Sequence, residues 1–295
     1  MAVIIAGPSP ASAELAWSIA DAAGVRIVDL DWKRFPDGEH YVRVRGDVRG
    51  EDVFVVQTMS PPQNDSLVQA LLLADAAIGM GAERVRLIAP YLAYSRQDRR
   101  FLEGEPVSVE VVLKSLRCAG YDWLLTVEVH KEESLKAFDG EAYNLSPYEY
   151  MAGRINVRGD ILVLAPDVGA LDRARRLAGA LDAEYDYLVK HRDRITGEIV
   201  VEPKEIPARG KTVVLVDDII STGGTLAKAA SMLLSQGAER IYALVAHALM
   251  VGGALEKLSR AGITKIYAAN TLPAKSHEII EYVDVGPLIA ESLPV

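Results

Sequence analysis

Short runs of consecutive apolar residues alternate along the chain with stretches of helical periodicity, and this alternation restricts the fold more than any other feature. The runs that we predict to be strands are Val3–Ala6, Val53–Gln57, Val85–Ala89, Leu124–Glu128, Ile161–Ala165, Thr212–Val216 and Ile241–Ala246. The stretches that we predict to be helices are Asp65–Gly79, Val107–Ala119, Leu171–Leu181 and Thr225–Gln236. Strands that are apolar along their whole length are typical of parallel sheets covered by helices on both faces. The sequence therefore predicts an α/β fold.

The tetrapeptide Gly-Ala-Glu-Arg occurs at residues 81–84 and again at residues 237–240. Four identical residues could arise by chance, but both copies follow an Ala- and Leu-rich helix pattern and precede a strand pattern. A repeat at such a long interval indicates two similar domains and not a solenoid. We predict domains at residues 1–145 and 146–282, with residues 283–295 packing back on the first domain.

The charge balance limits the kinds of partner that the chain can have. Lys and Arg number 32 and Asp and Glu number 41, which gives a net charge of −9. This balance argues against a broad nucleic-acid interface, but it leaves room for a small basic site for phosphates. No run of about 18 apolar residues exists, and the first residues have the pattern of a strand and not of a signal peptide. The single cysteine, Cys118, excludes a disulfide within the chain, which favours a cytosolic protein. From the charge and the apolar pattern we expect no membrane partner and no nucleic-acid partner.

A carboxylate pair and a turn rich in hydroxyls and glycines follow a predicted buried strand between residues 213 and 225. The residues concerned are Asp217, Asp218, Ser221, Thr222, Gly223, Gly224 and Thr225. Glycines let a ligand approach the backbone closely, and hydroxyls and N–H groups at a helix N-terminus suit a phosphate. Adjacent carboxylates can hold vicinal hydroxyls, and ligands of open α/β sheets bind beyond the carboxyl ends of the strands. The alternative is a capped strand-to-helix turn with solvated carboxylates.

Five further loops contain candidate functional residues. These residues are Phe35, Asp37 and Glu39; Arg96 and Gln97; His130; Asp167, Val168, Gly169 and Ala170; and Lys190 and Arg192. Arginine forks bind phosphate, and a glutamine amide can bind the edge of a base. Taken singly, each loop also has a simpler interpretation: an ordinary turn, a solvated basic loop, a structural histidine, an aspartate helix cap or solvated cations.

Together, the order and spacing of these six segments resemble the ribose-phosphate pyrophosphokinase family, and the resemblance covers essentially the whole chain. Segment 213–225 alone resembles the phosphoribosyl-pyrophosphate-binding loop of the phosphoribosyltransferases. The resemblance implies two duplicated phosphoribosyltransferase-like domains, each a mainly parallel sheet flanked by helices. It also implies transfer of the diphosphoryl group of ATP to the 1-hydroxyl of ribose 5-phosphate, with release of AMP.

The resemblance assigns the sugar phosphate to the second domain. There, Asp217 and Asp218 would bind the ribose hydroxyls and Ser221–Thr225 would hold the 5-phosphate, while Asp167–Ala170 would face the transferred diphosphate. The first repeat has Gln57-Thr58 in place of the two aspartates, and no Gly-Gly follows. Only one half of the chain should therefore bind the sugar phosphate.

The resemblance also implies a metal site and a catalytic loop. His130 and Asp167 would bind Mg²⁺, a cation that suits the carboxylate better than the imidazole. Lys190 and Arg192 would stabilise charge on the transferring and leaving phosphates. We expect Lys190–Val200 to be mobile without ligand, because its charged residues have little apolar surface to bury.

ATP would be held by residues of the first domain. Arg96 and Gln97 match ATP-binding positions, and Phe35 would stack on the adenine with Asp37 and Glu39 beside it. In the family this last loop comes from a neighbouring subunit, so the resemblance implies a homo-oligomer of at least two chains.

Three competing interpretations remain. A phosphoribosyltransferase would explain the Asp217-Asp218 loop but not the duplicated domain or the basic loops. A related regulatory subunit without activity would be expected to have lost loop residues, whereas Lys190, Arg192, Asp217 and Asp218 are all present. A nucleotide-binding transcriptional regulator is disfavoured by the acidic charge balance.

Overall fold

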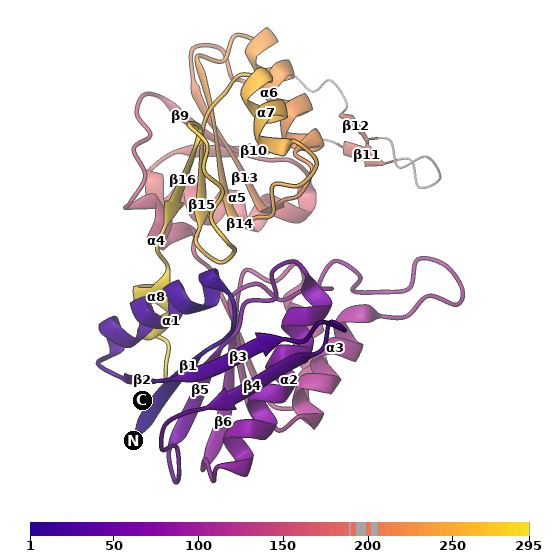
Figure 1. The fold of residues 1–295 in the computed structure, drawn as a ribbon. Coiled ribbons are helices and arrows are strands. Elements are labelled where there is room, and N and C mark those ends of the chain that lie inside the picture. The colour runs from indigo at the N-terminus through magenta and orange to yellow at the C-terminus, as the bar shows by residue number, and fades with distance from the viewer. Residues whose placement is uncertain (189, 193–198, 202–205, 295) are drawn as a thin grey trace. The chain divides into compact units, whose positions relative to one another are not determined.

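The computed structural model describes residues 1–188, 190–192, 199–201 and 206–294 of the 295-residue chain (Figure 1). These residues form two compact units. The first unit comprises Met1–Ser146, Thr271–Pro273 and Asp284–Val295, and the second comprises Pro147–Asn270 and Ala274–Val283. The chain therefore returns to the first unit twice after leaving it. No helix within the described ranges is both long enough and apolar enough to cross a membrane.

A parallel six-stranded sheet with the order β2-β1-β5-β6-β7-β8 forms the centre of the first unit. Its strands are β1 (Ala2–Ala6), β2 (Arg26–Val28), β5 (Asp52–Val56), β6 (Arg84–Ala89), β7 (Trp123–Val127) and β8 (Glu141–Leu145). All five residues of β7 are buried, as are the last four of β5. These strands are continuous apolar runs because both faces of the sheet are covered by helices.

Helices cover this sheet, and one of them comes from the C-terminal end of the chain. They are α1 (Pro10–Ala23), α2 (Gln63–Gly79), α3 (Ser108–Cys118), the 3-10 helix η1 (Glu132–Phe138) and α8 (Gly286–Ala290). Helix α8 packs on α1, and the Ser18 hydroxyl donates a 2.5 Å hydrogen bond to Asp284. The buried side chain of Arg86 donates to the carbonyl of Pro294 and pairs with Asp52 at 3.2 Å. Residues 284–294 thus complete the first unit.

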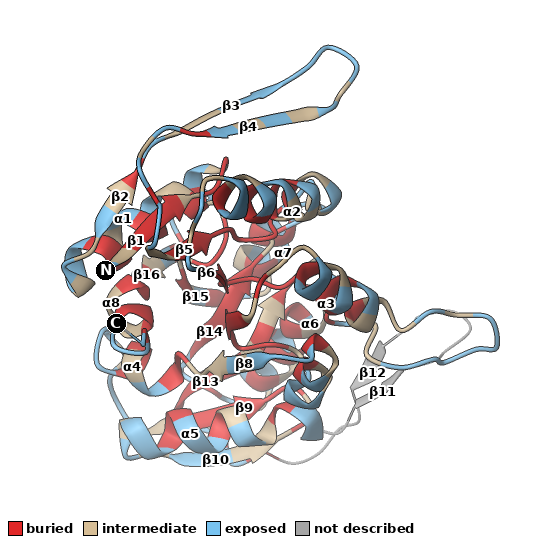
Figure 2. Ribbon diagram, turned by 90° about the horizontal axis from the view of Figure 1, so that it is seen from below, coloured by how far each residue is buried: buried red, intermediate tan, exposed pale blue. Residues whose placement is uncertain are grey.

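An antiparallel hairpin, β3 (Leu30–Arg34) and β4 (His40–Val44), projects from the body of the first unit (Figure 2). Much of its surface is exposed, and β4 packs against α2. The sequence does not predict this hairpin, because its apolar residues neither alternate regularly nor form a continuous run.

The second unit is built around another parallel six-stranded sheet, with the order β10-β9-β13-β14-β15-β16. Its strands are β9 (Ile161–Ala165), β10 (Glu184–Tyr187), β13 (Thr212–Ile220), β14 (Arg240–Ala248), β15 (Ile263–Ala269) and β16 (Ile280–Val283). A second antiparallel pair, β11 (Lys190–Arg192) and β12 (Ile199–Val201), comes between β10 and β13 in the sequence. The prediction that Lys190–Val200 is mobile falls largely outside the described residues.

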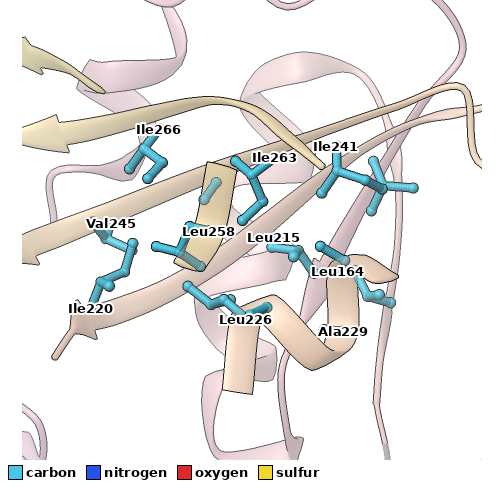
Figure 3. Packing of buried hydrophobic residues seen from close by; sticks show 14 of the residues in the cluster. Leu164, Leu215, Ile220, Leu226, Ala229, Ile241, Val245, Leu258, Ile263 and Ile266 are labelled. Carbon is cyan, nitrogen blue, oxygen red and sulfur yellow. The ribbon is translucent and has the colours of Figure 1, made fainter. Parts of the chain in front are cut away.

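The helices of the second unit are α4 (Tyr148–Ala152), the 3-10 helix η2 (Val168–Ala170), α5 (Leu171–Leu181), α6 (Gly224–Ser235) and α7 (Ala254–Arg260). Leu226 of α6 and Leu258 of α7 pack on a core that includes Leu215, Val245 and Ile266 from the three central strands (Figure 3). Burying each such side chain stabilises the unit by about 1.5–3 kcal/mol. This core fixes the strand ends that carry the polar loops.

The two units share their strand order and the turn made by the repeated tetrapeptide. Gly81 and Gly237 have φ angles of +87° and +93°. The carbonyl of each accepts a 2.8 Å hydrogen bond, from the N–H of Gly50 in the first unit and of Gly210 in the second. The predictions of an α/β fold and of a duplicated domain are thus confirmed. Most strand boundaries differ from the predicted ones by one or two residues, and the largest difference is at β13, which extends to Ile220, four residues beyond the predicted strand.

Candidate functional site

The two aspartates of the predicted sugar-phosphate site lie in β13, near its carboxyl end. Asp218 is buried, and Asp217 is partly buried. The backbone N–H of Asp218 donates a 2.9 Å hydrogen bond to the Oδ1 atom of Asp217. The hydroxyl of Tyr148 donates to the backbone carbonyl of Asp217 at 3.0 Å. Strand pairing and this tyrosine therefore fix the backbone of Asp217, from which the first carboxylate projects.

Burial and neighbouring charges determine the ionisation of this pair. Burial raises the pKa of Asp217 well above its usual range, and the nearby negative charges of Asp218 and Asp167 add to the effect. Arg173 on α5 opposes it, with its Nη2 atom 3.9 Å from the Oδ2 atom of Asp218. The three carboxylates thus concentrate negative charge, which favours a bound cation or hydroxyl donors.

The turn after β13 combines backbone geometry with a helix N-terminus. Gly223 has a φ of +70°, and a Cβ atom there would lie 3.0 Å from the side chain of Leu258. Helix α6 begins directly after it without a side-chain cap. The carbonyls of Ser221 and Thr222 accept hydrogen bonds from the N–H of Val251 and the Nζ atom of Lys257. Because the first N–H groups of a helix lack intrahelical partners, this end of α6 suits an anion.

The loop after β9 lies at the same edge of the sheet, because β9 and β13 are paired with Leu164 opposite Leu215. Asp167 caps the short helix that follows it: its Oδ1 atom accepts a 2.9 Å hydrogen bond from the N–H of Gly169. Its backbone carbonyl accepts from the N–H of Ala170. The capping interpretation is therefore observed, and the same carboxylate also adds to the charge at Asp217.

The predicted catalytic cations, Lys190 and Arg192, are the first and last residues of β11. The backbone of Lys190 pairs with Val201 and that of Arg192 with Ile199. The side chains of these residues lie outside those that the structure describes, so their catalytic role stays a prediction.

The predicted adenine-binding loop closes the tip of the β3–β4 hairpin. The N–H of Phe35 donates to the carbonyl of Glu39 at 2.8 Å, and the N–H of Glu39 donates to the side chain of Asp37 at 3.2 Å. The Phe35 ring is 38% exposed and makes an edge contact with Tyr41, with the ammonium of Lys33 4.5 Å from its centroid. The turn therefore presents an aromatic face flanked by acidic and basic side chains.

The loop that holds Arg96 and Gln97 follows β6 in the first unit. Arg96 is exposed, and the N–H of Gln97 donates to the carbonyl of Tyr94, whose φ is +64°. The Oε1 atom of Gln97 accepts a hydrogen bond from the hydroxyl of Ser108 at the start of α3. This bond uses the oxygen of the amide, so its N–H₂ group is the part that can donate to an acceptor on a ligand.

His130 follows β7 in the first unit, whereas Asp167, the other predicted metal ligand, belongs to the second. Glu128, two residues before His130, is buried and has a φ of +45°, which is uncommon for a non-glycine residue. Among the described residues, no group of three His, Cys, Asp or Glu side chains is placed to hold a metal. Mg²⁺ commonly takes only one or two protein ligands besides water and phosphate, so this finding does not test the assignment.

Sequence reasoning missed Arg173, Tyr148 and Glu128 at these strand ends. Arg173 and Tyr148 reach the aspartate pair from other elements, so no local pattern indicates them. For Glu128 a signal exists, since an acidic residue at the end of a buried strand is unusual.

Comparison with known proteins gives a consistent result. The family model for the N-terminal domain of ribose phosphate pyrophosphokinase matches residues 3–120, and the phosphoribosyl transferase domain model matches residues 149–268. A ribose-phosphate pyrophosphokinase from Aeropyrum pernix is 45% identical over 295 residues, covering 99% of this chain and 96% of the relative. One from Saccharolobus solfataricus is 43% identical over 278 residues, covering 94% and 95%. The crystal structure of phosphoribosylpyrophosphate synthetase from Mycobacterium smegmatis superposes with a TM-score of 0.89 at 29% identity, covering 99% of this chain and 97% of that one.

Proposed function

The chain belongs to the ribose-phosphate pyrophosphokinase family, and on this premise we propose that it transfers the diphosphoryl group of ATP to the 1-hydroxyl of ribose 5-phosphate. The products are 5-phosphoribosyl 1-diphosphate and AMP. The observation that carries the proposal within the structure is the Asp217–Asp218 pair beside the glycine turn at the start of α6. It unites a site for vicinal hydroxyls with a site for a phosphate, as ribose 5-phosphate requires.

Ribose 5-phosphate binds in the second unit. Asp217 and Asp218 accept hydrogen bonds from the ribose hydroxyls, and Ser221–Thr225 hold the 5-phosphate at the N-terminus of α6. Asp167–Ala170 face the diphosphate as it is transferred. The charge of Arg173 partly offsets that of the two aspartates, which keeps the pair available as acceptors.

The residues of this edge fit a divalent cation. Asp167 and Asp218 both raise the pKa of Asp217, and a bound cation would relieve that repulsion. We assign Mg²⁺ to Asp167, with His130 as the second ligand. When bound, Mg²⁺ neutralises charge on the phosphate oxygens.

ATP binds through residues of the first unit. Phe35 stacks on the adenine, with Asp37 and Glu39 beside it, and Arg96 and Gln97 bind the remaining polar groups. The hairpin that carries Phe35 acts in the site of a neighbouring copy, so the active form is a homo-oligomer. The single cysteine suits a cytosolic enzyme.

The reaction is an in-line displacement at phosphorus. The oxygen of the 1-hydroxyl attacks the β-phosphorus of ATP and its proton is released to water. The bond from that phosphorus to the bridging oxygen of the α-phosphate breaks, and AMP leaves with that oxygen. Lys190 and Arg192 stabilise the negative charge on the transferring and leaving groups. Catalysis is thus mainly a matter of positioning and charge, with little covalent chemistry for the protein.

Phosphorus NMR of the purified protein with ATP, ribose 5-phosphate and Mg²⁺ tests this function. AMP should appear together with a diphosphate attached to the sugar. Formation of ADP would instead indicate an ordinary kinase. Retained binding of ribose 5-phosphate without turnover would indicate a regulatory subunit, and either result would overturn the proposal.

A further inference from the structure

Both strands of the β3–β4 hairpin contact one carboxylate on α2 at the base of the loop Phe35–Glu39. Arg34 ends β3, His40 begins β4, and the two residues are paired across the hairpin. The Nη2 atom of Arg34 lies 3.6 Å, and the Nε2 atom of His40 lies 3.3 Å, from the same Oδ2 atom of Asp65. Asp65 therefore contacts the residue before the loop and the residue after it.

Arg34 carries this contact into the loop itself. Its Nε atom donates a 3.2 Å hydrogen bond to the backbone carbonyl of Gly38, whose φ is +102°. One guanidinium thus bridges the turn of the loop and the carboxylate of Asp65. A substitution at Asp65 would therefore change the position of the loop backbone, although Asp65 is not part of the loop.

His40 is held on its other side as well. Its Nδ1 atom lies 3.1 Å from the Nε2 atom of Gln69, which is one helical turn beyond Asp65 on α2. The His40 side chain is 9% exposed and that of Asp65 is 25% exposed, so water competes little for the contact between them. Asp65 also lies in the first turn of α2, where the helix dipole favours a negative charge.

We propose that Asp65 is the positioning residue for the ATP-binding loop, setting the orientation of Phe35–Glu39 through Arg34 and His40. The inference rests on the proposed function, because it needs that loop to bind ATP. Asp65 itself contacts no substrate. Its loss should weaken ATP binding and leave ribose 5-phosphate binding unchanged, since that site is built from the second unit.

The experiment measures KM for both substrates, and kcat, in the full-length enzyme carrying Asp65→Ala. Loss of the Arg34 ion pair and of the His40 contact predicts a rise in KM for ATP of about threefold to tenfold, with kcat and KM for ribose 5-phosphate nearly unchanged. Asp65→Glu, which keeps the carboxylate, should recover at least part of the ATP affinity. Asp75→Ala, an exposed aspartate on the same helix, is the matched control and should change neither KM.

Phe35→Ala separates this inference from the proposed function. If Phe35→Ala raises KM for ATP and Asp65→Ala does not, the positioning role is wrong while the ATP site stands. If neither variant raises it, the ATP assignment of the loop fails. Equal losses for both substrates in Asp65→Ala, without recovery in Asp65→Glu, would show that Asp65 only stabilises the fold.

Discussion

The equivalent strands β5 and β13 of the two units lead into different polar residues at their carboxyl ends. Asp52 of β5 pairs with Arg84, and Thr212 of β13 pairs with Arg240, where both arginines belong to the repeated tetrapeptide. This shared register places Gln57 and Thr58 of the first unit where the second has Asp217 and Asp218. One fold thus presents a neutral pair in one copy and a charged pair in the other.

The neutral pair makes internal hydrogen bonds. The Thr58 hydroxyl donates to the carbonyl of Thr271 at 2.5 Å and accepts from the N–H of Tyr91 at 3.3 Å. The N–H of Thr58 donates to the hydroxyl of Ser12 at 3.0 Å. In the second unit the equivalent residues repel one another, and burial raises the pKa of Asp217. The unit to which we assign the sugar phosphate thus keeps an arrangement that costs stability, whereas the first unit uses the equivalent positions for buried hydrogen bonds.

Each unit has an antiparallel strand pair before its third core strand, β3–β4 before β5 and β11–β12 before β13. The largest expected effect on activity comes from a substitution in β11. Replacing Lys190 with Ala should lower kcat by about 30-fold to 1,000-fold, as loss of about 2–4 kcal/mol of charge stabilisation predicts. Binding of ribose 5-phosphate, measured by calorimetry, should remain nearly intact. Lys265→Ala, on β15 of the same unit, is the control and should keep its activity. Near-full turnover of the Lys190 variant would refute the catalytic assignment.

The neutral pair can be broken directly. Thr58→Val keeps the shape of the side chain but removes the hydroxyl that donates to the carbonyl of Thr271 and accepts from the N–H of Tyr91. The urea midpoint should fall by the equivalent of about 1–3 kcal/mol, the usual cost of losing a buried hydrogen-bonding group. Thr58→Ser keeps the hydroxyl and should lose less. Equal stability of the Val and Ser variants would show that the hydroxyl contributes nothing.

The repeated turn offers a matched pair of substitutions. Gly81→Ala and Gly237→Ala each place a side chain at a φ near +90°, which should cost about 1–2 kcal/mol. Calorimetry should show similar losses in the two variants, because the two turns have the same hydrogen bonds. A large loss in one variant and none in the other would contradict the structural equivalence of the units.

The smallest effect is a gain in stability. Because folding raises the pKa of Asp217, the folded state holds the proton more tightly than the unfolded chain does, and the ionised carboxylate lowers stability. Asp217→Asn should therefore raise the thermal midpoint at neutral pH. This gain should shrink as pH falls through the raised pKa and vanish below the ordinary carboxyl range.

Glu278→Gln, at an exposed carboxyl of the same unit and outside any helix, provides the control for this variant. It should leave both the thermal midpoint and the activity unchanged. If Asp217→Asn were destabilised at neutral pH, the carboxylate pair would be a stabilising feature and the contrast between the two units would be lost.

The sequence predicts the centres of both sheets because their strands are continuous apolar runs with helices between them. It does not predict the hairpins: in β3, Trp32 is exposed and both faces carry polar residues, so no period marks the strand. The aspartate pair and its glycine turn are visible because they occupy one run of sequence. Arg173 and Asp65 are not, because each contacts its partners across elements that only folding brings together.

The return of the chain to the first unit has a consequence for synthesis. A ribosome makes residues 1–146 first, yet that unit also contains Thr271–Pro273 and the segment from Asp284 onward. Until those residues emerge, Arg86 lacks the carbonyl of Pro294 and α1 lacks the cover of α8. The half that is translated first is therefore the half whose folding is completed last.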